Sequence, residues 1–149
     1  MTARDTTSDE RFPREKECQQ IVLAVAREYC GYDYPSIARG ALTRISKITA
    51  GYDSRGKHIP GLHPSTVGKV LEEADPRTGR WRQRGNRKET IHLLIYAFAH
   101  EYCGDGEGGL ASTAPERIAR LVSAQGGTIE PDDVRRVLED AIQTVESNA

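Results

Sequence analysis

A run of cations between residues 75 and 88 is the strongest chemical signal in the sequence. Six of these 14 residues are Arg or Lys and one is acidic. Arg outnumbers Lys five to one, and a guanidinium group can contact a phosphate through two hydrogen bonds or enter a narrow minor groove. A solvated linker is the alternative interpretation, and Trp81 could pack on the core instead of stacking on a sugar or base. The candidate DNA-binding residues of this segment are Arg77, Arg80, Trp81, Arg82, Arg84, Arg87 and Lys88.

A second set of candidates lies at the start of a helix predicted to begin at Pro64. Ser65 and Thr66 could donate hydrogen bonds to phosphate at the helix N-terminus, and Lys69 follows one turn later. We expect these three residues in or over the major groove, and Gly68 would permit close approach to a surface. Capping of the helix is an equally good explanation for the two hydroxyl groups.

Four more cations precede this helix. Arg44 and Lys47 lie on the preceding predicted helix and could contact phosphates. Arg55 and Lys57 lie in a long connection between the two helices and could extend the same positive surface. A plain mobile loop is the alternative for that connection.

No pattern in the sequence indicates catalysis. The GxGxxG, P-loop, GxSxG and HExxH motifs are all absent, so we expect neither an enzyme nor a cofactor. His92, His100 and Cys103 have helical spacing, but zinc normally requires four closely defined ligands, so we expect no metal. Cys30 and Cys103 occupy matched positions and are interpreted as small buried residues.

The chain contains an internal repeat. Residues 21–51 align without a gap on residues 94–124, with 10 identities in 31 positions, and residues 62–74 align on 129–141 with 6 identities in 13. The first copy has six extra residues near positions 53–59. Because the apolar positions keep their phase and order, we interpret the two copies as a duplication.

Each copy is predicted to form three helices. Apolar residues at Cys18, Ile21, Val22, Val25 and Tyr29 lie on one helical face, and the same spacing recurs from Ile91 to Tyr102. The second helices are expected over about 41–50 and from Pro115 to the glycines at 126 and 127. The third helices are expected to begin at the prolines at 64 and 131, and the second of them to continue through Ile142 and Val145. Their predicted buried faces are formed by Val67, Val70, Leu71 and Ala74, and by Val134, Val137, Leu138 and Ala141.

The near-zero net charge hides an uneven distribution. The chain has 21 Lys and Arg against 22 Asp and Glu, a net charge of −1. Residues 11–90 contain 16 cations and 9 acids, whereas residues 91–149 contain 4 cations and 10 acids. We predict a disordered arm at 1–13, a basic unit at 14–86 and an acidic unit at 87–149.

The paired second and third helices resemble those of the winged-helix/helix-turn-helix superfamily, over about residues 15–145. The resemblance is carried by residues 44–71 with the basic segment behind them, and by residues 117–138. It implies a mainly α fold of two tandem three-helix units, with a basic wing or loop after the first. The long connection at 51–61 departs from the short turn usual in that family.

The resemblance and the charge together imply a non-enzymatic protein that binds double-stranded DNA through its first unit. Transcription regulation or genome organisation is the expected role, in the cytoplasm and associated with the nucleoid. The second unit carries acids at the start of its third helix, so it is expected to pack on the first unit or to form a homodimer. A tandem winged-helix scaffold that binds protein, as in chromosome-partition complexes, is the alternative.

The sequence gives no indication of a membrane or of a small-molecule substrate. No apolar run approaches the roughly 18 residues that a membrane span needs. The first ten residues include no hydrophobic stretch, so we expect no secretory signal. Three cysteines without CxxC spacing favour a reducing compartment.

Overall fold

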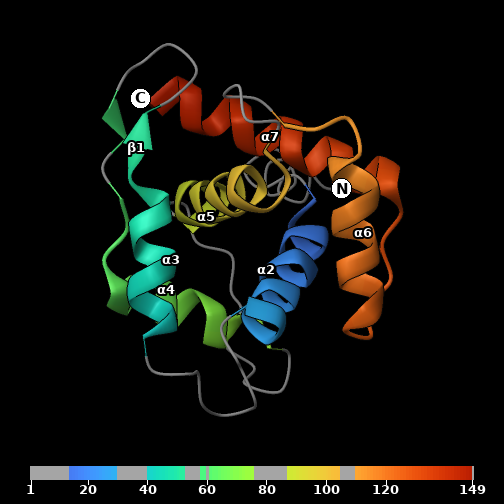
Figure 1. Ribbon diagram of the computed structural model, residues 1–149, viewed down its shortest axis with the longest axis horizontal. Helices are drawn as coiled ribbons and strands as arrows, with labels where there is room; N and C mark the ends of the chain where they lie inside the picture. Colours follow the sequence, from blue (N-terminus) through green and yellow to red (C-terminus); the bar gives the residue numbers. More distant parts are fainter. Residues whose placement is uncertain are drawn as a thin grey trace, which may run out of the picture.

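The protein is mainly α, as predicted. The computed structural model describes residues 14–29, 40–52, 58–59, 61–75, 87–104 and 110–148. The first half contributes α2 (Glu15–Tyr29), α3 (Ala41–Thr49) and α4 (Pro64–Glu73), and the second half contributes α5 (Arg87–Cys103), α6 (Ala114–Ala124) and α7 (Pro131–Asn148) (Figure 1). Within these ranges, none of the helices combines the length and the apolar character that a membrane crossing requires.

Both third helices begin at the predicted prolines. Pro64 and Pro131 each occupy the first turn, where the missing N–H has no partner within the helix in any case. The apolar positions predicted for α4 are buried, and so are the matching positions of α7. The buried residues are Val67, Val70, Leu71 and Ala74 in the first half, and Val134, Val137, Leu138 and Ala141 in the second.

The long connection between α3 and α4 contains a small antiparallel sheet. Strands β1 (Gly51–Tyr52) and β2 (His58–Ile59) pair with Gly51 opposite Ile59 and Tyr52 opposite His58. Ile59 is buried, so this short sheet is attached to the body of the protein. The long connection at 51–61 therefore contains paired strands at 51–52 and 58–59.

The two halves exchange partners at their second helices: each second helix packs on the first helix of the other half, whereas each third helix packs on the first helix of its own half. Helix α3 packs chiefly on α4 and on α5, which belongs to the other half. Likewise, α6 packs on α7 and on α2, and α2 also contacts α5. Figure 1 shows α5 in the middle of the molecule, between the α3–α4 pair and α6. Each half therefore completes its packing with a helix from the other half.

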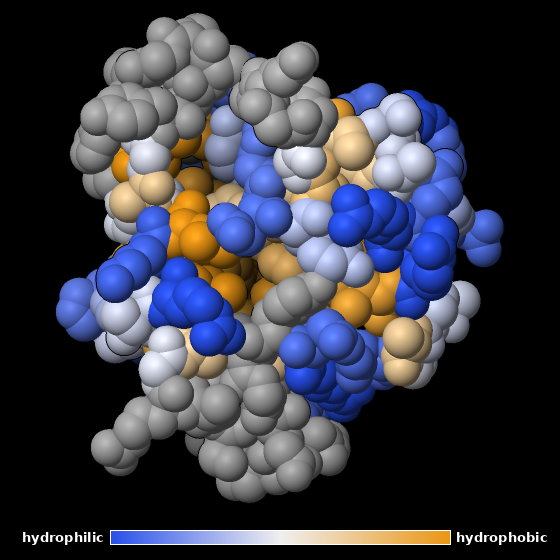
Figure 2. Space-filling model, in the orientation of Figure 1, coloured by the Kyte–Doolittle hydropathy of each residue, from blue (hydrophilic) through white to orange (hydrophobic). Residues whose placement is uncertain are grey.

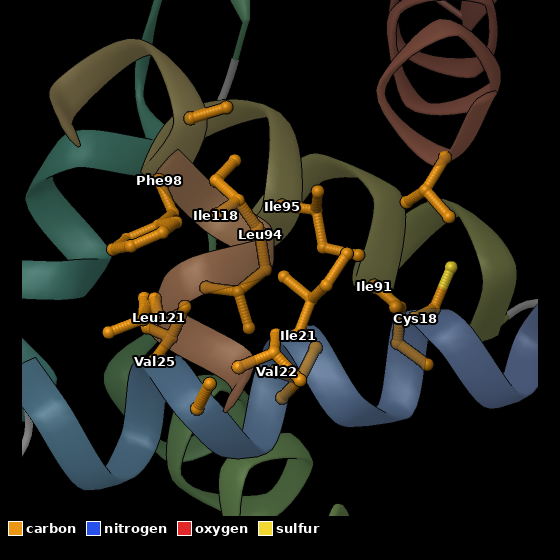
Figure 3. Packing of buried hydrophobic residues seen from close by; sticks show 14 of the residues in the cluster. Cys18, Ile21, Val22, Val25, Ile91, Leu94, Ile95, Phe98, Ile118 and Leu121 are labelled. Atoms are coloured by element: carbon orange, nitrogen blue, oxygen red, sulfur yellow. The ribbon is translucent and has the colours of Figure 1, made fainter. Parts of the chain in front are cut away.

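A single hydrophobic cluster joins all six described helices. Figure 3 shows side chains of α2 such as Ile21 and Val22 directed toward Leu94 and Ile95 of α5, with Ile118 of α6 close by. All five of these side chains are buried. Burying an aliphatic side chain of this size stabilises a fold by about 1.5–3 kcal/mol, so the cluster is the main force that holds the halves together.

Polar contacts from α2 add to this attachment at the turn between α6 and α7. The Gln20 side-chain oxygen accepts a hydrogen bond from the Thr128 backbone N at 2.8 Å. Arg27 donates to the Gln125 carbonyl at 2.9 Å, and the Gln125 amide donates to Glu28 at 2.9 Å. We call Gln20, Arg27 and Glu28 the α2 brace.

Candidate nucleic-acid interface

Helix α3 presents two of the predicted DNA-binding cations to solvent. Arg44 and Lys47 are both exposed and lie three residues apart, so they share a face of the helix. The opposite face buries Ala41, Ile45 and Thr49. In Figure 2, strongly hydrophilic residues gather over the side of the molecule where Figure 1 places α3.

Helix α4 exposes the next three candidates along one side. Ser65 and Lys69 are exposed and lie four residues apart, and Thr66 is half-buried between them. Burial of Val67 and Leu71 on the opposite face fixes this orientation. The α3–α4 pair thus brings together Arg44, Lys47, Ser65, Thr66 and Lys69, five of the predicted site residues.

His63 caps α4, which neither Ser65 nor Thr66 does. The Nδ1 atom of His63 accepts a hydrogen bond from the Ser65 backbone N at 3.1 Å and lies 2.8 Å from the Ser65 hydroxyl oxygen. The capping alternative for the two hydroxyl groups therefore does not describe this helix. The unshared backbone N–H groups of the first turn give the start of α4 a partial positive charge.

Gly68 serves the packing of α4 on α3. It is buried, and a Cβ atom at this position would lie 3.0 Å from Cδ1 of Leu42 on α3. The close approach that the sequence suggested is therefore an approach between α4 and α3.

Two hydroxyl groups of α3 hold the backbone of Leu62, just before α4. Thr49 Oγ1 accepts from the Leu62 backbone N at 2.7 Å and donates to the Ser46 carbonyl at 2.6 Å. Ser46 Oγ donates to the Leu62 carbonyl. Thr49 is only 2% exposed, so its hydrogen bonds are formed away from water. Both backbone polar groups of Leu62 are therefore bound to α3.

Gly61 permits this close contact. A Cβ atom at position 61 would lie 2.9 Å from the Ala50 Cβ and 2.9 Å from Thr49 Oγ1. Real Cβ atoms do not approach other heavy atoms so closely, so only glycine fits without a shift of the backbone. We call Ser46, Thr49, Gly61 and Leu62 the Leu62 clamp.

The acidic residues of the α3–α4 pair are confined to the end of α4. Helix α3 contains none, whereas α4 contains Glu72 and Glu73, which follow Lys69 by three and four residues and are therefore its neighbours on the helix surface. A phosphate near Lys47 would meet no negative side chain from α3 itself. Electrostatic attraction to an anionic backbone is favoured at such a surface.

Nine predicted site residues remain. Seven of them fall outside the described residues, namely Arg55, Lys57, Arg77, Arg80, Trp81, Arg82 and Arg84. Arg87 begins α5. Lys88 is half-buried in the first turn of α5, one turn before His92, whose Nδ1 lies 2.8 Å from Thr144 Oγ1 on α7. Lys88 therefore lies beside the contact between α5 and α7.

Helix α7 compensates its own charges. Asp132 forms ion pairs with Arg135 and with Arg136, the latter at 3.3 Å. Arg135 also lies 3.4 Å from Glu139. The hydrogen bond from Arg135, together with the charges of Arg135 and Arg136, lowers the pKa of Asp132. The cations of α7 are therefore partly neutralised by acids of the same helix.

Burial also changes the pKa of a cysteine on α5. Burial raises the pKa of the Cys103 thiol above its ordinary value, and Arg117 opposes this shift. Within the described ranges, no group of three or more His, Cys, Asp or Glu side chains could hold a metal ion. Cys30 lies outside those ranges.

The residues that orient the interface were not predicted from the sequence. Ser46 and Thr49 looked like ordinary residues of a short helix, and His63 is not among the usual N-cap types. The available signal was the pair of hydroxyls near the end of α3, followed by a glycine just before α4.

Comparisons with protein-family models, with curated proteins and with solved structures found no match for this chain. A function must therefore be argued from the described residues themselves. Among the described residues, the α3–α4 pair forms the clearest candidate surface. It exposes cations and the Ser65 hydroxyl group, and the Leu62 clamp holds the start of α4.

Proposed function

We propose that this chain is a non-enzymatic protein that binds double-stranded DNA through the exposed side of α3 and α4. One observation carries the proposal. Two packed helices expose Arg44, Lys47 and Lys69, and no acidic residue occurs on α3 or on α4 before Glu72. Cations on neighbouring helices suit the closely spaced phosphates of a duplex.

In the proposed complex, the first turns of α4 enter the major groove. Ser65 and Lys69 then face base edges or the flanking phosphates, while Arg44 and Lys47 contact the backbone from α3. In helix-turn-helix proteins, the second helix of the pair contacts base edges and the first crosses the DNA backbone.

The finer fold assignment is part of the same proposal. The α3–α4 pair would be a helix-turn-helix variant in which the β1–β2 sheet replaces the short turn. The basic segment at 77–88 would act as a wing or loop that adds phosphate or minor-groove contacts. The number of cations in this segment supports this role.

The second half would not read DNA in the same manner. Asp132 and Asp133 stand where α4 has Ser65 and Thr66, and like charge would repel phosphates there. The Asp132 ion pairs support this asymmetry. Regulation of transcription or organisation of a genome, with association to the nucleoid, is the role that fits one DNA-binding face.

A salt titration of binding to a random-sequence duplex tests the proposal. We expect log K to fall linearly with log salt, with about −0.9 of slope for each phosphate neutralised. Lys69→Ala should weaken binding to all sequences and reduce the magnitude of the slope by about one.

Arg120→Ala is the matched control, because Arg120 is exposed on α6 at the position that corresponds to Lys47. It should leave affinity and slope close to the values of the unmodified protein, whereas Lys47→Ala should lower both. Undetectable binding at low salt, or equal losses in the two variants, would contradict the proposal. The protein-binding scaffold would then be the better account.

A further inference from the structure

We infer that the Leu62 clamp is a positioning device for DNA binding, with Ser46 and Thr49 as positioning residues that act through α4. This inference rests on the proposed function and assigns a role to residues that do not themselves face the duplex. Thr49 is buried, and both hydroxyl groups are directed to the backbone of Leu62.

The clamp joins the end of α3 to the start of α4. Leu62 comes one residue before His63, which caps α4, and two residues before the helix begins at Pro64. Its N–H is bound to Thr49 and its carbonyl to Ser46, both in the second half of α3. Because the two bonds hold the peptide units on either side of the Leu62 Cα, they restrict both the position and the rotation of the chain that enters α4.

The second half shows that such hydroxyl groups are not needed to build a helix pair of this type. Ala119 and Val122 stand at the positions that match Ser46 and Thr49, and Ile129 matches Leu62. The turn between α6 and α7 is held from outside, by the α2 brace. The clamp therefore occurs in the half that carries the proposed DNA-binding face, and α6 carries no hydroxyl at either matched position.

A fixed angle between α3 and α4 matters because phosphate contacts come from both helices. Lys69 on α4 and Arg44 on α3 can reach one duplex together only if the helices hold a constant relation. Fixing that relation before binding removes an entropic cost from association. Loss of the clamp should therefore weaken the contacts of α4 while those of α3 remain.

A double-mutant cycle tests this expectation. In the unmodified protein, Lys69→Ala should reduce duplex affinity by roughly five- to tenfold and reduce the salt slope by about one. In a Thr49→Val background, the same change should reduce affinity by about twofold or less, because α4 is already misplaced. Arg44→Ala should have the same effect in both backgrounds.

Three further variants separate positioning from general destabilisation. Thr49→Ser keeps the hydroxyl and should restore the full effect of Lys69→Ala. Ser46→Ala removes only the bond to the Leu62 carbonyl and provides a milder variant if Thr49→Val does not fold. Gln20→Met weakens the α2 brace instead, so it should lower stability without changing the effect of Lys69→Ala.

The outcomes distinguish this inference from the proposed function. If the unmodified protein binds duplex and Lys69→Ala has its full effect in the Thr49→Val and Ser46→Ala backgrounds, the positioning role is wrong and DNA binding stands. If the unmodified protein does not bind duplex at low salt, both are wrong. A reduced Lys69 effect that Thr49→Ser restores supports the inference.

Discussion

The imidazole of His63 is the N-cap of α4. Its Nδ1 atom takes the backbone N–H of Ser65, one of the groups that a helix leaves without an internal partner. The ring also lies against the Ser65 hydroxyl. The cap therefore orders the first turn of α4, which is the part proposed to enter the major groove.

We expect His63→Ala to lower the free energy of unfolding by about 1 kcal/mol, the usual loss when a capping side chain is removed. His63→Asn should retain most of the stability, because an Asn side chain can accept the same hydrogen bond. Urea denaturation of the two variants followed by circular dichroism measures the difference. Equal stability of both variants and the unmodified protein would show that the cap contributes nothing.

His92 is the clearest case of a titratable group changed by its surroundings. Burial, and to a smaller extent the charge of Lys88, lowers the pKa of His92 to about 4 from its ordinary value of 6.5. The neutral ring lies against Thr144 of α7. Because the unfolded chain binds the proton first, the stability of the native state is complete above pH 6.5 and declines as the pH falls toward 4.

We expect this decline to amount to at most about 3 kcal/mol between pH 6.5 and 4. His92→Asn keeps a polar atom toward Thr144 but does not titrate, so it should flatten that part of the profile. Urea denaturation at a series of pH values gives the measurement. His100→Asn, on the same helix, is the control and should keep the slope. An unchanged slope in His92→Asn would contradict the assignment.

At the scale of single residues, the sequence predicted burial better than polar partners. The apolar positions of α4 and α7 followed from helical periodicity, which depends only on spacing along the chain. Thr49 could not be assigned its partner, because the backbone of Leu62 lies 13 residues away and comes close only when the helix pair forms. The proposed contacts of Lys69 and Arg44 with DNA stay predictions.

At the scale of elements, the turn between α6 and α7 depends on two adjacent glycines. Gly126 has a φ of +90°, which favours glycine. A Cβ at Gly127 would lie 2.6 Å from Cγ1 of Val122 and 2.7 Å from the Gln20 side-chain oxygen. The α2 brace can therefore reach this turn only because position 127 has no side chain.

Gly127→Ala should lower the free energy of unfolding by about 1–3 kcal/mol, as is usual where extra atoms enter a packed site. Gly51→Ala is the control, because nothing lies within 4 Å of a Cβ at that position. Thermal or urea denaturation of the two variants checks this. The prediction fails if the two substitutions have the same effect.

The helices were predictable as elements, whereas the small sheet was not. Helix starts at Pro64 and Pro131 followed from proline chemistry, and α7 continues past Val145 as its apolar spacing suggested. Strands β1 and β2 have two residues each, which is too short for an alternating pattern to appear. Their pairing depends on contacts with the body of the protein, such as the burial of Ile59.

At the scale of the whole molecule, the packing of each second helix on the first helix of the other half should make unfolding cooperative. Helix α6 packs on α2 of the other half, and both belong to one hydrophobic cluster. We expect Ile118→Ala, in α6, to lower the stability of the entire chain by about 2–5 kcal/mol. Neither half should keep its structure once the other is lost.

Cysteine labelling can follow both halves in this experiment. Cys18 on α2 and Cys103 on α5 are buried, so each thiol reacts only after local opening. In a Cys30→Ser background, both thiols should become reactive at the same urea concentration, and Ile118→Ala should move both midpoints together. Separate midpoints for the two thiols would show that the halves unfold independently.

The exchange itself could not be read from the sequence. Each apolar face shows that a helix is buried but does not identify the helix that covers it. The face of α3 around Ile45 could equally have packed on α2, within the same copy, as on α5. The choice depends on the length and path of the connections between helices, which the pattern of apolar residues does not encode.

The exchanged packing has a consequence for how such a chain could arise. In a protein with one copy of the repeat, the second helix would lack the first helix that covers it here, so that helix would depend on pairing with a second identical chain and its folding would depend on concentration. Joining two copies in one chain removes that dependence and allows the two faces to differ in sequence. One face here keeps Ser65 and Thr66 where the other has Asp132 and Asp133, a divergence that a symmetric pair of identical chains cannot achieve.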